Sequence, residues 1–353
     1  MLYQTENPHG GDLYGREGML DFSSNINPLG TPEAVRRAAI ESLAGLERYP
    51  DPFCRRLRAA IAVCEGVPEE WILCGSGAAE LIYSFCAAAR PDPSLELAPT
   101  FSEYALALAA ADCRTIRYPL EREHDFTLAG DFLPALERSG ARAVFLCNPN
   151  NPTGRLIPQA LLEQTAELCH EKGVCLFVDE CFLDLSDGWE NGSLKHLLGS
   201  CPELMILKAF TKNYGMAGLR LGYCLCADGA LLSEMSKAVQ PWNVSVPAQA
   251  AGVAALEERG FLERARAVIF CERTWMTKAM RELGLWVCPS QANYLLFYAP
   301  FPLAEKTPAH GVLLRDCGNY PGLGKGWFRA AVKRREKNER LLAALSAAIR
   351  EAH

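Results

Sequence analysis

Short apolar runs alternate with helical stretches through the first two thirds of this chain, and polar residues follow many of the runs. In two clear examples, residues 143–147 lead into the polar turn 148–154, and residues 174–178 lead into Asp179 and Glu180. Such alternation is typical of an α/β protein with a parallel sheet, whose ligands bind at the carboxyl ends of the strands. The sequence therefore predicts an α/β fold with its functional site at one edge of the sheet.

The pattern changes in the last third of the chain. Residues 246–283 are mostly helical, short apolar runs follow, and residues 336–351 have the pattern of an amphipathic helix. A chain of 353 residues is too long for one compact core and suits one large and one smaller domain. We expect a large domain over residues 46–242 with a mostly parallel central sheet, and a smaller α+β domain formed by residues 243–353 together with residues 1–45.

Composition and charge exclude several classes of protein. The net charge is −6, and the one clear basic run is at residues 333–337, so no nucleic-acid groove is expected. The 15 cysteines are scattered and include no C-x-x-C pair, which indicates buried thiols in a reducing cytosol, not a disulfide framework. We find no metal-ligand spacing, no signal peptide and no membrane-spanning run. We therefore expect a cytoplasmic protein without a metal.

The stretch 208–223 carries the first candidates for chemistry. Lys212 follows the apolar run 204–207 in a short polar turn, and Arg220 lies eight positions further on. A lysine just past a buried strand can condense with an aldehyde cofactor, and a nearby arginine can hold a phosphate group by paired, charge-assisted hydrogen bonds. Two ordinary surface charges on a loop would give the same pattern, so this stretch alone leaves both interpretations open.

Two further segments agree with a phosphate-bearing cofactor. Residues 71–74 lead through the glycine turn 75–77 into an apolar helix, where free backbone N–H groups and the helix dipole favour an anion. The same arrangement is common in proteins without any ligand there. Asp179 ends an apolar run, so its carboxylate needs a partner. It either caps a helix or pairs with a protonated ring nitrogen.

The glycine turn at 75–80, the turn 148–154, Asp179, Lys212 and Arg220 occur in this order along the chain. In this the chain resembles the fold-type I pyridoxal-phosphate enzymes, the aspartate-aminotransferase superfamily. Within it, the chain is most similar to the threonine-phosphate decarboxylases of cobalamin biosynthesis, and next to the histidinol-phosphate aminotransferases. The segments that favour the decarboxylases are residues 9–11, 20–30, 240–244 and 314–323. The resemblance covers nearly the whole chain and implies an aspartate-aminotransferase-like fold with pyridoxal 5′-phosphate as cofactor.

The resemblance also implies roles for the candidate residues around the cofactor. Lys212 binds the cofactor aldehyde and later moves protons, and Asp179 pairs with the ring nitrogen. Asn151 donates to the phenolic oxygen of the ring, and Phe101 stacks on the ring face. The residues implied at the cofactor phosphate are Gly77, Ala78, Thr211, Arg220 and, from the partner subunit of a homodimer, Tyr49.

For the substrate, the resemblance implies a second group of residues. Arg329, within Phe-Arg-Ala-Ala-Val, matches the arginine that binds the substrate carboxylate in the family. The resemblance implies that Asn151 contacts the substrate as well as the cofactor. The residues that match decarboxylase positions in contact with phosphothreonine are His9, Gly10, Asn25 and Arg315.

The chain departs from the family pattern at two positions. Ala209 stands three residues before the lysine, where the family usually has a serine or threonine that donates to the cofactor phosphate. One hydrogen bond is then missing, worth on the order of 1–3 kcal/mol. Phe182 stands where many aminotransferases have a tyrosine, and the decarboxylases also tend to have phenylalanine there.

The function implied is decarboxylation of L-threonine O-3-phosphate, or of a close phosphoamino acid such as phosphoserine, to the aminoalkyl phosphate used in cobalamin biosynthesis. The alternative is an aminotransferase of histidinol phosphate or an aromatic amino acid, because the same residues serve both reactions. A regulatory cofactor-binding protein is a third hypothesis, against which the complete set of Asp179, Lys212 and Arg220 argues. A homodimer is expected only from the family role of Tyr49.

Overall fold

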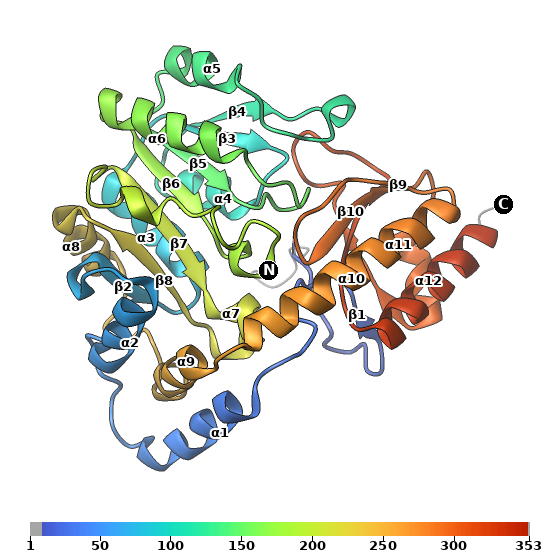
Figure 1. Ribbon diagram of the computed structural model, residues 1–353, viewed down its shortest axis with the longest axis horizontal. Helices are drawn as coiled ribbons and strands as arrows, with labels where there is room; N and C mark the ends of the chain where they lie inside the picture. The colour runs from blue at the N-terminus through green and yellow to red at the C-terminus, as the bar shows by residue number, and fades with distance from the viewer. Residues whose placement is uncertain (1–8, 352–353) are drawn as a thin grey trace.

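The computed structural model describes residues 9–351 and contains two main sheets that lie side by side (Figure 1). The larger sheet has seven strands and the smaller one four. The predicted small domain includes residues 1–8 and 352–353, which lie outside the described residues, and the boundaries at 46 and 242 stay a prediction. None of the helices within residues 9–351 has both the length and the apolar character needed to cross a membrane.

The seven-stranded sheet has the order β2-β8-β7-β6-β5-β3-β4. β8 runs antiparallel to both of its neighbours, and the other four strand pairs are parallel. The mostly parallel central sheet predicted from the sequence is therefore confirmed. Its strands are β2 (Ile72–Gly75), β3 (Ser94–Ala98), β4 (Thr115–Pro119), β5 (Ala143–Cys147), β6 (Cys175–Asp179), β7 (Leu204–Ala209) and β8 (Gly222–Cys226).

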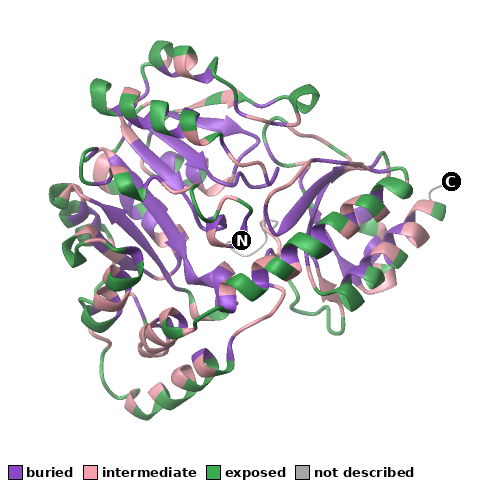
Figure 2. Ribbon diagram, in the orientation of Figure 1, coloured by how far each residue is buried: buried purple, intermediate pink, exposed green. Residues whose placement is uncertain are grey.

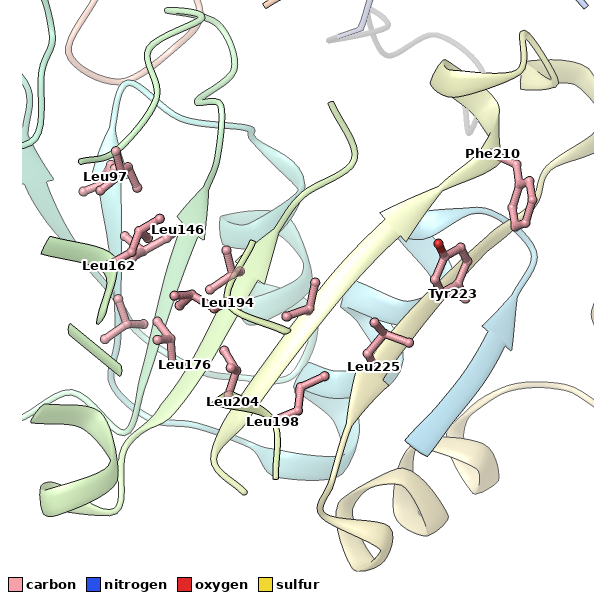
Figure 3. Close-up of a cluster of buried hydrophobic side chains, with 14 of the residues drawn as sticks. Leu97, Leu146, Leu162, Leu176, Leu194, Leu198, Leu204, Phe210, Tyr223 and Leu225 are labelled. Atoms are coloured by element: carbon pink, nitrogen blue, oxygen red, sulfur yellow. The ribbon is translucent and has the colours of Figure 1, made fainter. Parts of the chain in front are cut away.

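Helices cover both faces of this sheet, so its central strands are largely buried and mostly apolar (Figures 1 and 2). Successive side chains of a strand point to opposite faces. In β5, Leu146 packs in a leucine-rich layer on one face (Figure 3), whereas Phe145 packs with Phe85 and Phe177 on the other. The covering helices are α2 (Arg55–Glu65), α3 (Ala78–Ala89), α4 (Glu103–Ala110), α5 (Phe132–Ser139), α6 (Gln159–Lys172), α8 (Gly229–Ala238) and α9 (Val246–Glu257).

The smaller part of the fold is built on an antiparallel sheet of order β12-β13-β10-β9. The long helix α10 (Phe261–Glu282) runs from the larger part across this sheet (Figure 1). The remaining strands are β1 (Leu20–Asp21), β9 (Trp286–Val287), β10 (Tyr294–Tyr298), β11 (Val312–Leu313), β12 (Arg315–Asp316) and β13 (Trp327–Ala331). The remaining helices are α1 (Glu33–Ser42), α7 (Phe210–Asn213), α11 (Leu303–Lys306) and α12 (Arg335–Arg350).

Residues 20–22 of the N-terminal segment pack with this smaller part, whereas α1 packs on α9. β1 pairs in parallel with β11, with Leu20 opposite Val312. The buried side chain of Phe22 joins the apolar cluster that holds Met276 and Leu341. This docking brings the residues after Phe22 to the boundary between the two sheets.

Candidate active site

A cavity of about 410 Å³ opens at the carboxyl ends of β5, β6 and β7. Because these strands are parallel, their last residues Cys147, Asp179 and Ala209 reach the same edge of the sheet and line the cavity. Its other walls come from the smaller sheet and from the N-terminal segment. The predicted site residues that line it are His9, Gly10, Asn25, Ala78, Phe101, Asn151, Asp179, Thr211, Lys212, Arg220, Arg315 and Arg329.

Asp179 is buried and fixed by two hydrogen bonds. Its Oδ1 accepts from the backbone N–H of Cys181 at 2.9 Å, and its Oδ2 accepts from the hydroxyl of Tyr104 at 2.7 Å. The carboxylate caps no α-helix, because only a 3₁₀ turn at Leu183–Leu185 follows β6. Burial raises the pKa of Asp179, while its two partners and the charge of Lys212 act in the opposite direction. A cationic ligand such as a protonated ring nitrogen would offset this cost of burial.

Lys212 lies on α7, a single helical turn that begins directly after β7. The backbone N–H of Asn27 donates to the Lys212 carbonyl oxygen at 3.2 Å, and the Asn27 side chain donates to the next carbonyl oxygen at 2.7 Å. Burial and the charges of Arg329 and Arg220 lower the pKa of Lys212 to about 8. More of this amine is therefore neutral near physiological pH than in an ordinary lysine, and the neutral amine is the form that attacks an aldehyde.

The glycine turn and Arg220 meet because β2 and β8 pair. Gly75 lies opposite Gly222 in that ladder, close to the first residue of α3. Gly77 has a φ of +86°, and a Cβ there would lie 2.5 Å from Nη2 of Arg220. Only glycine permits this approach of a guanidinium to the N-terminus of a helix. Although Gly77 does not line the cavity, the arrangement suits a bound phosphate group.

Two arginines define the opposite end of the cavity. Arg315 on β12 pairs with Arg329 on β13, and both side chains are buried. Nη2 of Arg329 donates to the carbonyl oxygen of Ser23 at 2.8 Å, and Nη1 donates to Oδ1 of Asn151. Within the described residues, Nε of Arg329 and Oδ1 of Asn25 are buried without a hydrogen-bond partner. Unpaired buried polar atoms are costly, so these two indicate a polar ligand at this end.

Tyr49 lies outside the cavity of its own chain. Its ring stacks on that of Trp242, with 4.4 Å between ring centres, and the side chain is 77% exposed. Its contribution from a partner subunit therefore stays a prediction.

Both departures from the family pattern lie at the cavity. Ala209 ends β7 and places a methyl group there, without a hydroxyl. Because α7 is helical and not extended, Thr211 lines the same cavity as Lys212. Nζ of Lys212 lies 5.7 Å from the centre of the Phe182 ring.

Sequence analysis did not assign several residues that surround the cavity. Glu103, which lines the cavity, and Tyr104, which donates to Asp179 from the core, follow Phe101 after β3, so their position past a strand end was the signal that could have found them. The lining residues without an assigned role are Ser23, Ser24, Ala79, Glu103, Cys147, Cys181 and Tyr320.

Comparison with known proteins assigns this arrangement to a family. The sequence profile of the aminotransferase class I and II family matches residues 17–345. The chain belongs to this family. A class I/II relative named threonine-phosphate decarboxylase, from Salmonella typhimurium, is 37% identical over 331 residues, which cover 93% of this chain and 90% of the relative. Histidinol-phosphate aminotransferase 1 from Cupriavidus pinatubonensis is 33% identical over 342 residues, which cover 94% and 89%.

The fold agrees with this membership of the class I/II aminotransferase family. The solved structure of the histidinol-phosphate aminotransferase from Clostridium acetobutylicum matches with a TM-score of 0.87 at 26% identity, covering 94% of this chain and all of that one. The aspartate-aminotransferase-like fold expected from the sequence is confirmed.

The cofactor of the class I/II family is pyridoxal 5′-phosphate, and the cavity fits it. Because Gly77 has no side chain, the Arg220 guanidinium lies close to the N-terminus of α3, where the two would hold a phosphate together. Asp179 is a buried carboxylate in need of a cationic partner, and Lys212 has the depressed pKa that condensation with an aldehyde requires. These residues would hold the phosphate, the ring nitrogen and the aldehyde of the cofactor, respectively.

Proposed function

We propose that this enzyme decarboxylates L-threonine O-3-phosphate, or a close phosphoamino acid such as phosphoserine, to the aminoalkyl phosphate used in cobalamin biosynthesis. The observation that carries the proposal is a pair of buried arginines. Arg315 and Arg329 are neighbours on the adjacent strands β12 and β13, and both line the cavity. Guanidinium groups bind carboxylate and phosphate through paired hydrogen bonds, so two arginines suit a substrate with both anions. The 37% identity to a threonine-phosphate decarboxylase supports this substrate.

The chain's own residues position the cofactor for this reaction. When bound, pyridoxal 5′-phosphate supplies a ring that withdraws electrons from the substrate Cα. The carboxylate of Asp179 favours a proton on the ring nitrogen, and Phe101 covers the ring face. Asn151 donates to the ring oxygen, and Arg220 with the turn at Gly77 holds the phosphate.

The two arginines that bind the substrate, Arg315 and Arg329, decide which bond at Cα breaks. A decarboxylase aligns the bond from Cα to the carboxylate with the electron-accepting orbitals, whereas an aminotransferase aligns the bond from Cα to hydrogen. Arg329 binds the carboxylate and Arg315 the phosphate, and fixing both groups limits rotation of the substrate. After CO₂ leaves, Nζ of Lys212 donates a proton to Cα, for which a pKa of about 8 is well suited.

An aminotransferase of histidinol phosphate or an aromatic amino acid is the second candidate. It is favoured by the 33% identity to a histidinol-phosphate aminotransferase and by a cavity whose cofactor residues would serve either reaction. Phe182, where many aminotransferases have tyrosine, favours the decarboxylase.

We further propose a homodimer in which Tyr49 reaches the cofactor phosphate of the partner subunit. Supporting this, large apolar side chains at the end of α1 and in the loop after it are exposed: Ile40 (61%), Leu46 (62%), Tyr49 (77%) and Phe53 (58%). Light scattering in solution tests the dimer, and Tyr49→Phe in a dimer should weaken cofactor binding.

The decisive assay supplies the enzyme and cofactor with phosphothreonine and no keto acid. We expect CO₂ and aminopropanol phosphate in equal amounts. Transfer of the amino group that requires a keto acid and releases no CO₂ would overturn the proposal in favour of the aminotransferase. Phosphoserine lacks one methyl group, so we expect its kcat/KM to differ by roughly 10–200-fold at most.

A further inference from the structure

The N-terminal residues 9–11 form a turn that lies directly on the segment around Ser23; we name this turn the N-terminal clasp. The backbone N–H of Gly11 donates to the Ser23 hydroxyl oxygen at 2.7 Å. A Cβ at Gly10 would lie 2.5 Å from the Ser23 carbonyl oxygen, so glycine is needed for this contact. His9 and Gly10 line the substrate end of the cavity. The clasp therefore closes that end while resting on Ser23.

Asp21 fixes the side chain on which the clasp rests. Its Oδ1 accepts from the Ser23 backbone N–H at 2.8 Å and from the Ser23 hydroxyl at 2.5 Å. Its Oδ2 accepts from the hydroxyl of Ser24. Because the Ser23 proton is directed to Asp21, the Ser23 hydroxyl oxygen is left to accept from Gly11. Asp21 itself does not line the cavity.

The same segment connects the clasp to the carboxylate-binding arginine. The Ser23 carbonyl oxygen accepts from Nη2 of Arg329 at 2.8 Å. A second contact holds the other end of the clasp, because Nε2 of His9 lies 2.8 Å from Oε1 of Glu103. Ser23 thus lies between the clasp and Arg329, and its orientation sets the position of both.

We propose that Asp21 is a positioning residue for substrate binding, which acts by orienting Ser23 so that the N-terminal clasp is held over the substrate end of the cavity. The substrate it serves is an amino acid with a second anionic group, and this part of the inference rests on the proposed function. Loss of Asp21 releases the clasp, so the substrate binds more weakly, while the rate of the bound complex changes little.

Burial lowers the pKa of Lys333 and of Lys212, and the nearby charge of the Asp21 carboxylate partly opposes this lowering in both. A purely electrostatic role is therefore a competing explanation. Asp21→Asn separates the two, because its amide oxygen still accepts from Ser23 but the charge is gone. Asp21→Ala removes both the acceptor and the charge.

Trypsin reports on the clasp directly. Arg16 is the first lysine or arginine of the chain and is exposed, so cleavage there releases residues 1–16. We expect Ser23→Ala and Asp21→Ala, as full-length protein with cofactor, to release this peptide about 5-fold faster than wild type, which corresponds to one lost hydrogen bond. Asp21→Asn should be cleaved at close to the wild-type rate. Asp12→Asn, which removes an exposed charge beside the clasp, is the matched control and should not change cleavage.

Kinetics with phosphothreonine complete the test. We expect a KM about 5-fold higher or more for Ser23→Ala and Asp21→Ala, with kcat within about twofold of wild type. Wild-type cleavage in both alanine variants would overturn the inference, as would Asp21→Asn behaving like Asp21→Ala. Phosphothreonine should slow the tryptic release of residues 1–16 from the wild type. If the alanine variants are cleaved faster as expected but phosphothreonine does not slow cleavage of the wild type, the role of the clasp is supported and the proposed substrate is wrong. If Asp21→Ala does not fold, the cleavage rate and KM of Ser23→Ala decide whether Ser23 holds the clasp.

Discussion

Lys208 and Lys212 stand four residues apart where β7 passes into α7, yet their surroundings are opposite. Nζ of Lys208 lies 3.1 Å from Oε1 of Glu65 and 3.2 Å from Oδ1 of Asp184. Burial alone would lower the pKa of Lys208, but the nearby carboxylates outweigh burial and raise it well above its usual value. Around Lys212, burial and the charge of Arg329 lower the pKa to about 8.

The carboxylates around Lys208 also hold the turn that carries Lys212. Oδ2 of Asp184 accepts from Nδ2 of Asn213 at 2.7 Å, and Glu65 accepts from the hydroxyl of Tyr223 at 2.6 Å. Burial would raise the pKa of Glu65, but Lys208, Tyr223 and Lys195 together more than offset it and the pKa falls to about 2. Lys208 is thus a charged anchor, whereas the lowered pKa of Lys212 gives it a larger neutral fraction near neutral pH than an ordinary lysine has.

Lys212→Ala is expected to have the largest effect of the variants that test the contrast between the two lysines. We expect turnover of phosphothreonine to fall by roughly 10³-fold or more, because the group that binds the cofactor and moves the proton is gone. Folding should change little, since Lys212 makes no ion pair with any residue of 9–351. Steady-state kinetics and urea denaturation measure the two effects. Full turnover in this variant would instead favour a regulatory cofactor-binding protein.

Lys208→Met should have the converse effect, a large loss of stability. Removal of the ammonium takes the buried cation away from the buried carboxylate of Glu65 and the half-buried carboxylate of Asp184, which costs about 3–5 kcal/mol of the free energy of unfolding. Urea denaturation at neutral pH measures this loss. Lys195→Met is the matched control, because Lys195 also contacts Glu65 but is 41% exposed, and about 0–1 kcal/mol is expected. Equal losses in both variants would contradict the anchoring role of Lys208.

Arg329→Lys tests whether the arginine near Lys212 binds the substrate. The charge remains, but the fork that reaches Asn151 and Ser23 is lost, so we expect KM for phosphothreonine to rise roughly 10–100-fold. Arg334→Lys, on an exposed side chain close by in sequence, should leave KM unchanged. Similar KM values for Arg329→Lys and wild type would remove Arg329 from substrate binding.

The pH dependence of cofactor capture sharpens the difference between the two lysines. Below its pKa Lys212 holds a proton and cannot attack, so the rate at which apoprotein captures pyridoxal 5′-phosphate should rise as the pH rises through about 8. Arg329→Gln removes a charge that lowers this pKa, so the midpoint should move to higher pH. Stopped-flow absorbance measures the profile. An unchanged midpoint in Arg329→Gln would show that the charge of Arg329 does not lower this pKa.

Ala209→Ser is expected to have the smallest effect. It supplies the hydroxyl that the family usually carries, at a buried position that lines the cavity. We expect cofactor affinity to increase about 5-fold, for one added hydrogen bond of about 1 kcal/mol. Equilibrium dialysis against pyridoxal 5′-phosphate measures the change, and weaker binding would mean that the site cannot hold the extra atom.

The residues that sequence analysis found share a local signal. Asp179 directly follows an apolar run, Lys212 lies in the short turn after one, and Arg220 and Gly77 lie in glycine-rich turns, so their positions at a sheet edge follow from the alternation of strands and helices. The alternation also predicted the central sheet. The order of its strands is not contained in that pattern, because pairing is decided by packing between distant segments.

The residues that sequence analysis missed act through contacts that are far apart in sequence. Tyr104 was visible after a strand end, but its hydrogen bond to Asp179 spans 75 positions. Lys208 lies inside a strand that reads as apolar, and its partner Glu65 is 143 positions away. Only folding brings these groups together, so the ion pairs that anchor Lys208 could not be predicted from the local sequence.

Reduction of the enzyme–cofactor complex with borohydride tests the distinction between the lysines most directly. Borohydride makes the lysine–cofactor bond permanent, and trypsin does not cut after a modified lysine. We predict that the cofactor will be found on the peptide 209–220, which is uncut at Lys212, with normal cleavage after Lys208. Cofactor on the peptide 196–212, uncut at Lys208, would contradict the assignment of Lys212 as the reactive amine.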